Sequence, residues 1–124
     1  MQEENQKFSV RARIKSFKYA FNGLILFFKS EHNARIHLLA AVFAIALSIY
    51  LKLSYLEWIA ILVVISVVFI AELLNSSIEK LADIVSPEIH PKIKIIKDLA
   101  AGAVLVAAFL AIAVAGFIFL PKLF

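Results

Sequence analysis

The sequence predicts an all-α membrane protein in which an N-terminal amphipathic helix precedes three transmembrane helices. Three observations support this class: 63% of the 124 residues are apolar, only 18% are charged, and the mean hydropathy is +0.93. A soluble domain is about half apolar, so one core of this size cannot bury so much apolar surface. We expect residues 1–124 to form a single integral-membrane domain, with no separate soluble catalytic domain.

Composition also excludes several kinds of functional site. The absence of cysteine excludes a disulfide scaffold, a thiolate metal site and a cysteine nucleophile. Three glycines are too few and too scattered for the phosphate-binding loops of P-loop or Rossmann nucleotide sites. The net charge of +4 suits either nucleic acid or an anionic membrane surface, and the apolar content favours the membrane. No nucleic-acid partner is expected.

Residues 7–29 predict the amphipathic helix, which we expect to lie in the membrane interface. Two parallel stripes follow the helical period: Val10, Ile14, Phe17, Phe21, Leu24 and Phe28 on one side, and Arg11, Lys15, Lys18 and Asn22 on the other. The stretch lacks the apolar block and cleavage site of a secretory signal peptide.

The three predicted spans are residues 35–52, 57–82 and 98–120. The last contains 22 consecutive uncharged positions, Leu99 to Leu120, enough to cross a hydrocarbon core of ~30 Å. Seven lysines and arginines precede residue 36 and four lie between the second and third apolar runs, against only Lys52 and Lys122 elsewhere. This asymmetry predicts a cytoplasmic N-terminus and an external C-terminus.

The segment AELLNSSIEKLAD, residues 71–83, carries the most informative polar residues. Glu72, Asn75, Glu79 and Asp83 are spaced by 3, 4 and 4 positions, which places them on one helical face. Glu72 lies 14 residues after Trp58, roughly 21 Å along a helix and still within the membrane. Because a carboxylate at that depth costs about 2.5 kcal/mol or more, Glu72 is a functional candidate.

Several interpretations of this acidic face remain open. Three acids on one face repel each other unless a cation joins them, and magnesium bound with phosphates would satisfy that need. A polar contact between helices, or a small proton-coupled transporter or channel, would also use buried acids. Against a transporter, Ser66 is the only polar interruption between Trp58 and Ala71. Lys97 could neutralise a phosphate, or it could contribute only to the orientation of the chain in the membrane.

These segments resemble the small bacterial integral-membrane diacylglycerol kinases and the related undecaprenol kinases. The matching features are ExxNxxxExxxD within residues 72–83, KDLAAGAVLVA after a proline-containing loop, and EHNARIH before the first span. The resemblance covers nearly the whole chain. It implies a homotrimer in the bacterial plasma membrane that uses ATP and Mg²⁺ to phosphorylate a lipid alcohol, with sites at the cytoplasmic surface between subunits.

The resemblance also implies roles for individual residues. Glu72 would be the general base, with Asn75 helping to fix it, and Glu31 and Glu79 would hold the metal. The implied nucleotide-binding residues are Arg13, Tyr19, Glu31, Glu79, Asp83, Lys97 and Asp98.

The sequence departs from the family pattern at some positions and leaves the lipid open. Arg11 and Arg13 flank an alanine, so either could contact the nucleotide, and His37 stands where some members have another acid. LSYLEW, AAGAV and IFLPK look more like the undecaprenol kinases, which favours undecaprenol slightly over diacylglycerol.

Overall fold

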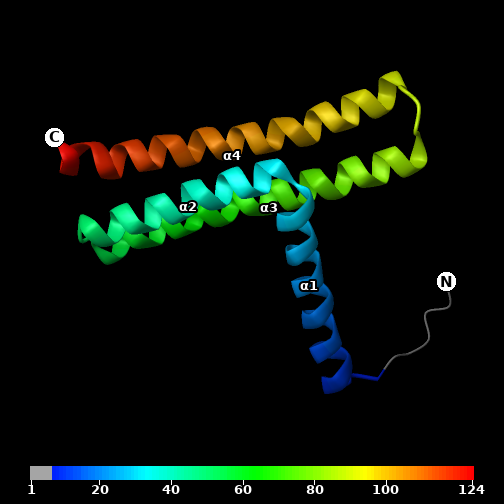
Figure 1. Cartoon of the computed structure of the whole chain (residues 1–124), viewed down its shortest axis with the longest axis horizontal. Coiled ribbons are helices and arrows are strands. Elements are labelled where there is room, and N and C mark those ends of the chain that lie inside the picture. Colours follow the sequence, from blue (N-terminus) through cyan, green and yellow to red (C-terminus); the bar gives the residue numbers. More distant parts are fainter. Residues whose placement is uncertain (1–6) are drawn as a thin grey trace. The chain divides into compact units, whose positions relative to one another are not determined.

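Four helices make up the part of the chain that the structure describes. The computed structural model describes residues 7–124, which form α1 (Val10–Ser30), α2 (His32–Tyr50), α3 (Tyr55–Val85) and α4 (Pro91–Leu123) (Figure 1). The chain divides into two compact units, one that carries α1 and ends at Ser30, and one from Glu31 to Phe124.

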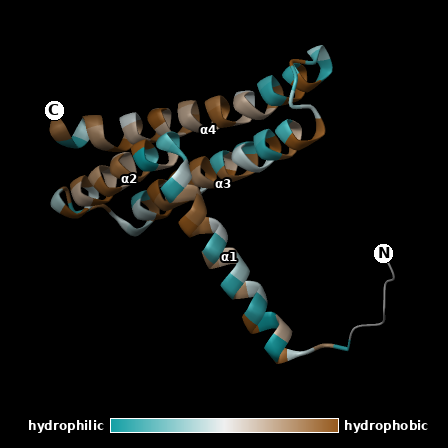
Figure 2. Ribbon diagram, turned by 45° about the vertical axis from the view of Figure 1, so that its right-hand side comes forward, coloured by the Kyte–Doolittle hydropathy of each residue, from teal (hydrophilic) through white to brown (hydrophobic). Residues whose placement is uncertain are grey.

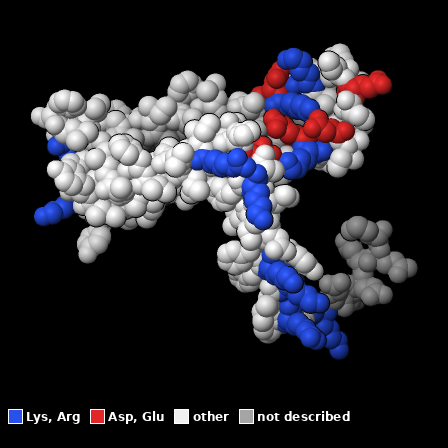
Figure 3. All heavy atoms as spheres, viewed as in Figure 1, with Lys and Arg blue, Asp and Glu red and all other residues white. Residues whose placement is uncertain are grey.

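The first unit is the single helix α1. Its start is capped by Ser9, whose hydroxyl accepts a hydrogen bond from the Ala12 N–H at 3.3 Å. Basic side chains lie along the helix in Figure 3, and hydrophilic and hydrophobic residues alternate on it in Figure 2. Arg13 and Tyr19 are both exposed on this helix. Its position in the membrane interface stays a prediction.

The second unit is a bundle of three helices, in which α3 packs against both α2 and α4 (Figure 1). All three are long and apolar enough to cross a membrane. Many large apolar side chains of these helices are exposed. Hydrophobic residues, brown in Figure 2, occur along all three helices. Such a surface needs lipid or protein neighbours, and the bundle is therefore that of a membrane protein.

The helices of the bundle are longer than the charge-free runs from which their spans were predicted. The clearest case is α4, which begins at Pro91 rather than at residue 98. Proline is the first helical residue, and the preceding His90 side chain accepts a hydrogen bond from the Lys92 N–H at 3.1 Å. Lys97 and Asp98 consequently lie almost two turns inside α4 rather than at its beginning.

The turn between α2 and α3 is short and tightly defined. Lys52 adopts a φ of 53° there, in the left-handed region. A capping box begins α3: the Ser54 hydroxyl accepts from the Glu57 N–H at 3.3 Å, and the Glu57 carboxylate accepts from the Ser54 N–H at 3.0 Å. These contacts fix how α2 leads into α3.

The buried apolar cluster lies near this turn. It consists of Leu53, Ile61 and Phe119, with Ala44, Leu47 and Trp58 among the residues packed against it. Towards the opposite end, the buried positions of α2 and α4 include the small residues Ala34 and Ala100, which allow close approach of helices. Gly102 makes no such approach to any of residues 7–124, because none of their atoms outside its own helix backbone and its chain neighbours lies within 4 Å of the position that a Cβ would take.

Candidate active site

The predicted polar stripe lies on one uninterrupted helix, α3, and runs from the bundle interior to solvent. Glu72 is buried, with 3% of its surface exposed, whereas Asp83 is exposed. Between them, the Asn75 side-chain amide donates to a Glu79 carboxylate oxygen at 3.4 Å. The Asn75 Oδ1 atom is buried and has no hydrogen-bond partner among the described residues. The Asn75 side chain therefore has an unpaired acceptor oxygen beside the Glu79 carboxylate.

Glu72 is joined to α2 by a hydrogen bond that the sequence alone did not indicate. His37 Nε2 lies 2.9 Å from Glu72 Oε1, and the two residues are 35 positions apart in the chain. The Glu72 side chain is 4% exposed and that of His37 is 26% exposed. Because an ionised carboxylate only accepts hydrogen bonds, the histidine nitrogen is assigned as the donor.

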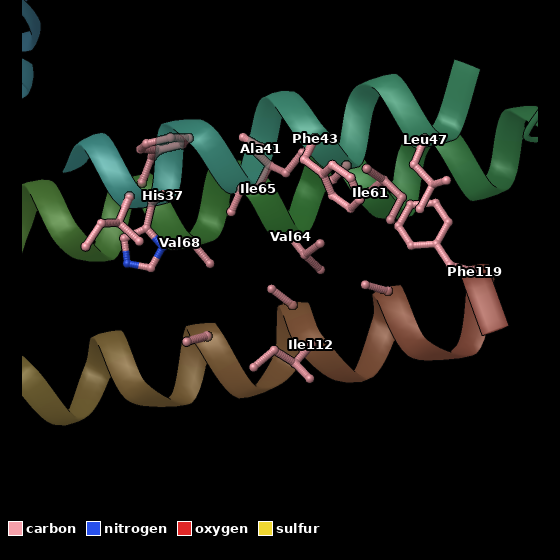
Figure 4. Close-up of a pocket in the computed structure, with 17 residues that line it drawn as sticks. His37, Ala41, Phe43, Leu47, Ile61, Val64, Ile65, Val68, Ile112 and Phe119 are labelled. Carbon is pink, nitrogen blue, oxygen red and sulfur yellow. The ribbon is translucent and has the colours of Figure 1, made fainter. Parts of the chain in front are cut away.

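An apolar groove of about 460 Å³ runs along the bundle from His37. Figure 4 shows His37 at one end and Phe119 at the other, with Ile112 of α4 across the groove from Val64 of α3. Its lining side chains come from all three helices and are apolar except for the imidazole: Ile36, His37, Ala40, Ala41, Phe43, Ala44, Leu47, Ile61, Val64, Ile65, Val68, Phe69, Ala108, Ala111, Ile112, Ala115 and Phe119. The groove could hold a hydrocarbon chain next to the residue that binds Glu72.

Acidic and basic side chains gather where α3 ends and α4 begins, as Figure 3 shows in red and blue. Lys97 Nζ of α4 lies 2.5 Å from Asp83 Oδ1 of α3. Lys94 Nζ lies 2.6 Å from Asp98 Oδ2, one turn along α4. These exposed ion pairs contribute little to stability, so the lysines can exchange partners at low cost.

An ion pair with a lysine joins Glu31 to α3. The Glu31 Oε1 atom lies 2.9 Å from Lys80 Nζ, which links the start of α2 to the residue that follows Glu79. In residues 7–124, no three acidic or histidine side chains come together as a ready-made metal site. A cation held by Glu31 and Glu79 would therefore need further ligands from a substrate or from water.

The structure thus brings together some of the predicted site residues and not others. Glu72, Asn75, Glu79 and Asp83 lie along α3, where Glu72 is bonded to His37 of α2 and Asp83 pairs with Lys97 of α4. Asp98 pairs with Lys94 within α4. Arg13 and Tyr19 belong to the separate α1 unit.

Three residues that the sequence analysis left without a site role take part in these contacts: His37, Lys80 and Lys94. One sequence signal could have singled out His37, because it is a titratable residue near the start of an apolar span. Nothing in the sequence identifies its partner, which lies on another helix.

The helices α2, α3 and α4 together carry groups that suit a charged reactant and groups that suit an apolar one. A buried carboxylate held by one donor can accept a proton, nearby lysines can neutralise anions, and the groove can hold an apolar chain. Such a site suits a reaction between a lipid hydroxyl and a water-soluble anion.

Comparisons with known proteins support this chemistry. Residues 18–119 match the model of the family described as "Prokaryotic diacylglycerol kinase". The chain is 35% identical to the undecaprenol kinase of Bacillus subtilis over 123 residues, which cover 99% of this chain and 100% of that protein. It is 38% identical over 109 residues to a diacylglycerol kinase of Synechocystis, covering 87% of this chain but 62% of that protein.

A diacylglycerol kinase of Helicobacter pylori is 35% identical over 106 residues, which cover 80% of this chain and 83% of that protein. The family model spans most of the chain, and the similarity to the Bacillus protein extends over the whole length of that protein. The chain therefore belongs to the prokaryotic diacylglycerol kinase family and is a membrane lipid kinase.

Proposed function

We propose that this lipid kinase transfers the γ-phosphoryl group of ATP to undecaprenol, with diacylglycerol as the alternative acceptor. One observation carries the proposal: Glu72 is a buried carboxylate whose hydrogen-bond partner, His37, lines an apolar groove. A membrane-embedded base beside such a groove suits an acceptor that arrives from the bilayer. The lysines at the end of α3 suit a phosphate donor that arrives from water.

Glu72 is the general base of the proposed reaction. It takes the proton of the lipid hydroxyl while the hydroxyl oxygen forms a bond to the γ-phosphorus of ATP. The bond from that phosphorus to the bridging oxygen breaks, and its electrons leave with ADP. Phosphoryl transfer needs mainly positioning and charge neutralisation, so a base and nearby cations suffice without a P-loop.

Side chains before α2 and along α3 carry oxygen atoms of the kind that a magnesium ion prefers. Glu31 and Glu79 offer carboxylate oxygens, and the unpaired Asn75 Oδ1 atom is a further oxygen beside Glu79. Hard cations such as Mg²⁺ prefer oxygen ligands and bind through one or two carboxylates plus substrate phosphates. When bound, the ion would neutralise charge that builds up on the phosphates.

We assign the remaining nucleotide contacts to residues of α1, α3 and α4. Lys97 binds the ATP phosphates in this proposal. Because its ion pair with Asp83 is exposed and weak, Lys97 can leave Asp83 when the phosphates are bound. Asp98 and Asp83 complete the polar rim, and Arg13 and Tyr19 of α1 contact the nucleotide. For Arg13, the neighbouring Arg11 is the alternative.

The similarity of this chain to an undecaprenol kinase supports undecaprenol as the acceptor, because it extends over all of both chains. In this proposal, the groove carries part of the isoprenoid chain, and His37 marks the end nearest the hydroxyl. The groove also weakens the transporter alternative, because beyond His37 its lining offers no polar path for an ion.

We further propose that three copies of the chain assemble in the bacterial plasma membrane, with the N-terminus cytoplasmic and the C-terminus outside. The large apolar side chains exposed on α2 and α4 are the surfaces that neighbouring copies and lipid would cover. The excess of basic residues near the N-terminus and between α3 and α4 supports this orientation.

The test of the catalytic assignment compares Glu72→Gln with Glu57→Gln, an acid-to-amide change on the same helix at its opposite end. Purified protein is reconstituted in lipid and given ATP labelled at the γ-phosphate. Glu72→Gln should lower turnover about 10³-fold while the oligomer stays intact, because an amide cannot accept the proton. Normal turnover in Glu72→Gln would disprove the role of this residue.

The lipid assignment is tested by offering undecaprenol and diacylglycerol together and separating the labelled products. We expect undecaprenyl phosphate to predominate; phosphatidic acid as the main product would reverse the choice of acceptor.

Ala111→Phe fills the groove and should raise the KM for lipid about tenfold without changing the KM for ATP. Ala113→Phe, on the same helix but outside the groove, is the matched control. Ion flux in proteoliposomes without any lipid phosphorylation would instead support a transporter.

A further inference from the structure

The contact between His37 and Glu72 is the most specific polar interaction inside the bundle. It joins α2 to α3 at 2.9 Å, and Glu72 is almost fully buried at one end of it. The histidine nitrogen approaches Oε1 of this carboxylate from the neighbouring helix. Within residues 7–124, the imidazole is therefore a group that can hold the carboxylate in place.

A buried glutamate needs such a partner for two reasons. An ionised carboxylate without a hydrogen bond is costly in an apolar environment. Its side chain also rotates about three bonds, so an unheld carboxylate would spend much of its time in orientations that cannot meet a substrate. A single donor at Oε1 can satisfy both needs, and the proposed reaction requires Oε2 to accept the proton.

The surroundings of His37 leave little else for the imidazole to do. On α3 the charged group that faces it is Glu72, and the side chains of α4 that share the groove with it are apolar. Figure 4 shows the ring directed to the end of the groove nearest Val68. His37 thus lies between the groove and the carboxylate.

We propose that His37 is a positioning residue for Glu72. Its Nε2–H donates to Glu72 Oε1 and orients the carboxylate so that Oε2 faces the lipid hydroxyl. This inference rests on the proposed role of Glu72 as the base. It gives a function to a histidine that the sequence alone left without one.

The experiment compares His37→Leu, His37→Gln and the control His32→Leu in the full-length protein reconstituted in lipid. Leucine removes the donor but keeps an apolar side chain, whereas the glutamine Nε2 can occupy the place of the imidazole Nε2. His32 is an exposed histidine on the same helix, outside the groove and without a hydrogen bond among the described residues. Size-exclusion chromatography checks the oligomer of each variant.

We expect His37→Leu to lower kcat about 30-fold while the KM for ATP stays within about twofold, because the change affects orientation of the base and not nucleotide binding. His37→Gln should recover kcat to within about threefold of wild type. His32→Leu should match wild type. If His37→Leu does not give a folded oligomer, the kcat of His37→Gln decides the question alone.

Two results would overturn the inference. Wild-type kcat in His37→Leu would show that the carboxylate needs no such donor. A loss in His37→Gln as large as in His37→Leu would show that the imidazole acts by something other than donating this hydrogen bond. Glu72→Gln separates these results from a failure of the proposed function. If Glu72→Gln is inactive, Glu72 remains the proposed base and only the role of His37 is disproved. If Glu72→Gln is active, the proposed role of Glu72 as the base is disproved as well.

Discussion

The two ends of the α2–α4 bundle are held together by different forces. At the α2–α3 turn, a capping box and the cluster of Leu53, Ile61 and Phe119 fix the backbone. At the α3–α4 loop, exposed ion pairs such as Lys97–Asp83 and Lys80–Glu31 predominate. Apolar packing depends on one close fit, whereas exposed ion pairs are weak and exchangeable. The first end therefore suits stability, and the second suits binding of charged reactants.

Among the variants that compare the two ends of the bundle, Lys97→Met should give the largest effect, and it should affect rate rather than stability. Loss of a cation that neutralises phosphate should lower kcat/KM for ATP about 100-fold, as removal of one charge-stabilising group commonly does. Initial rates over a range of ATP concentrations measure the change. Lys94→Met, which breaks an exposed pair one turn away in α4, is the matched control. Equal losses in both variants would contradict a specific role for Lys97.

Leu53→Ala should give the next largest effect, on stability alone. Leu53 is 8% exposed in the apolar cluster, and truncation of a buried leucine costs about 2 kcal/mol or more. The melting temperature in detergent should fall, while kcat at a permissive temperature stays near wild type. A change in the KM for ATP without a lower melting temperature would show that the two ends are not separate in function.

Glu79→Gln tests the role of one carboxylate at the charged end of the bundle, near the α3–α4 loop. Removal of one carboxylate ligand should raise the Mg²⁺ concentration for half-maximal activity about tenfold, and excess Mg²⁺ should restore most of the rate. A titration with Mg²⁺ at fixed ATP measures this. Glu88→Gln, in the α3–α4 loop, should behave like wild type. An unchanged Mg²⁺ requirement in Glu79→Gln would remove this residue from the metal site.

Lys122→Met should give the smallest effect. Lys122 forms an ion pair with Glu57 at 3.2 Å, which is the charged contact of the α2–α3 end. Because an exposed pair contributes little, kcat should be unchanged and the melting temperature should shift by no more than about 2 °C. A marked loss of activity would mean that charge matters at both ends of the bundle.

The sequence predicted the features of this protein that depend on one helix at a time. One long uncharged run, together with the distribution of basic residues around two shorter runs, predicted three spanning helices. The spacing of Glu72, Asn75 and Glu79 predicted a shared face, because helical geometry is local. The extent of α4 was underestimated because the lysines after Pro91 ended the apolar run without ending the helix. Charge marks where a membrane span ends, and it does not mark where a helix ends.

Contacts between helices were beyond the reach of the sequence. The His37–Glu72 hydrogen bond and the Lys80–Glu31 ion pair join residues 35 and 49 positions apart. Both depend on how far one helix is displaced along its neighbour, which hydrophobic periodicity does not specify. The acids of α3 were expected to need a cation to offset their repulsion, with magnesium as the candidate. In the structure, Lys97 pairs with Asp83 of α3, and Lys80 of α3 pairs with Glu31, which precedes α2.

The hydrogen bond between α2 and α3 also bears on how the chain enters the membrane. A solitary α3 would carry the Glu72 carboxylate into the bilayer without a partner, at a cost of about 2.5 kcal/mol or more. The helix made before it, α2, already carries His37, and the short turn around Lys52 keeps the two helices together. During synthesis, insertion of α2 and α3 as one hairpin would satisfy the acid before it meets lipid.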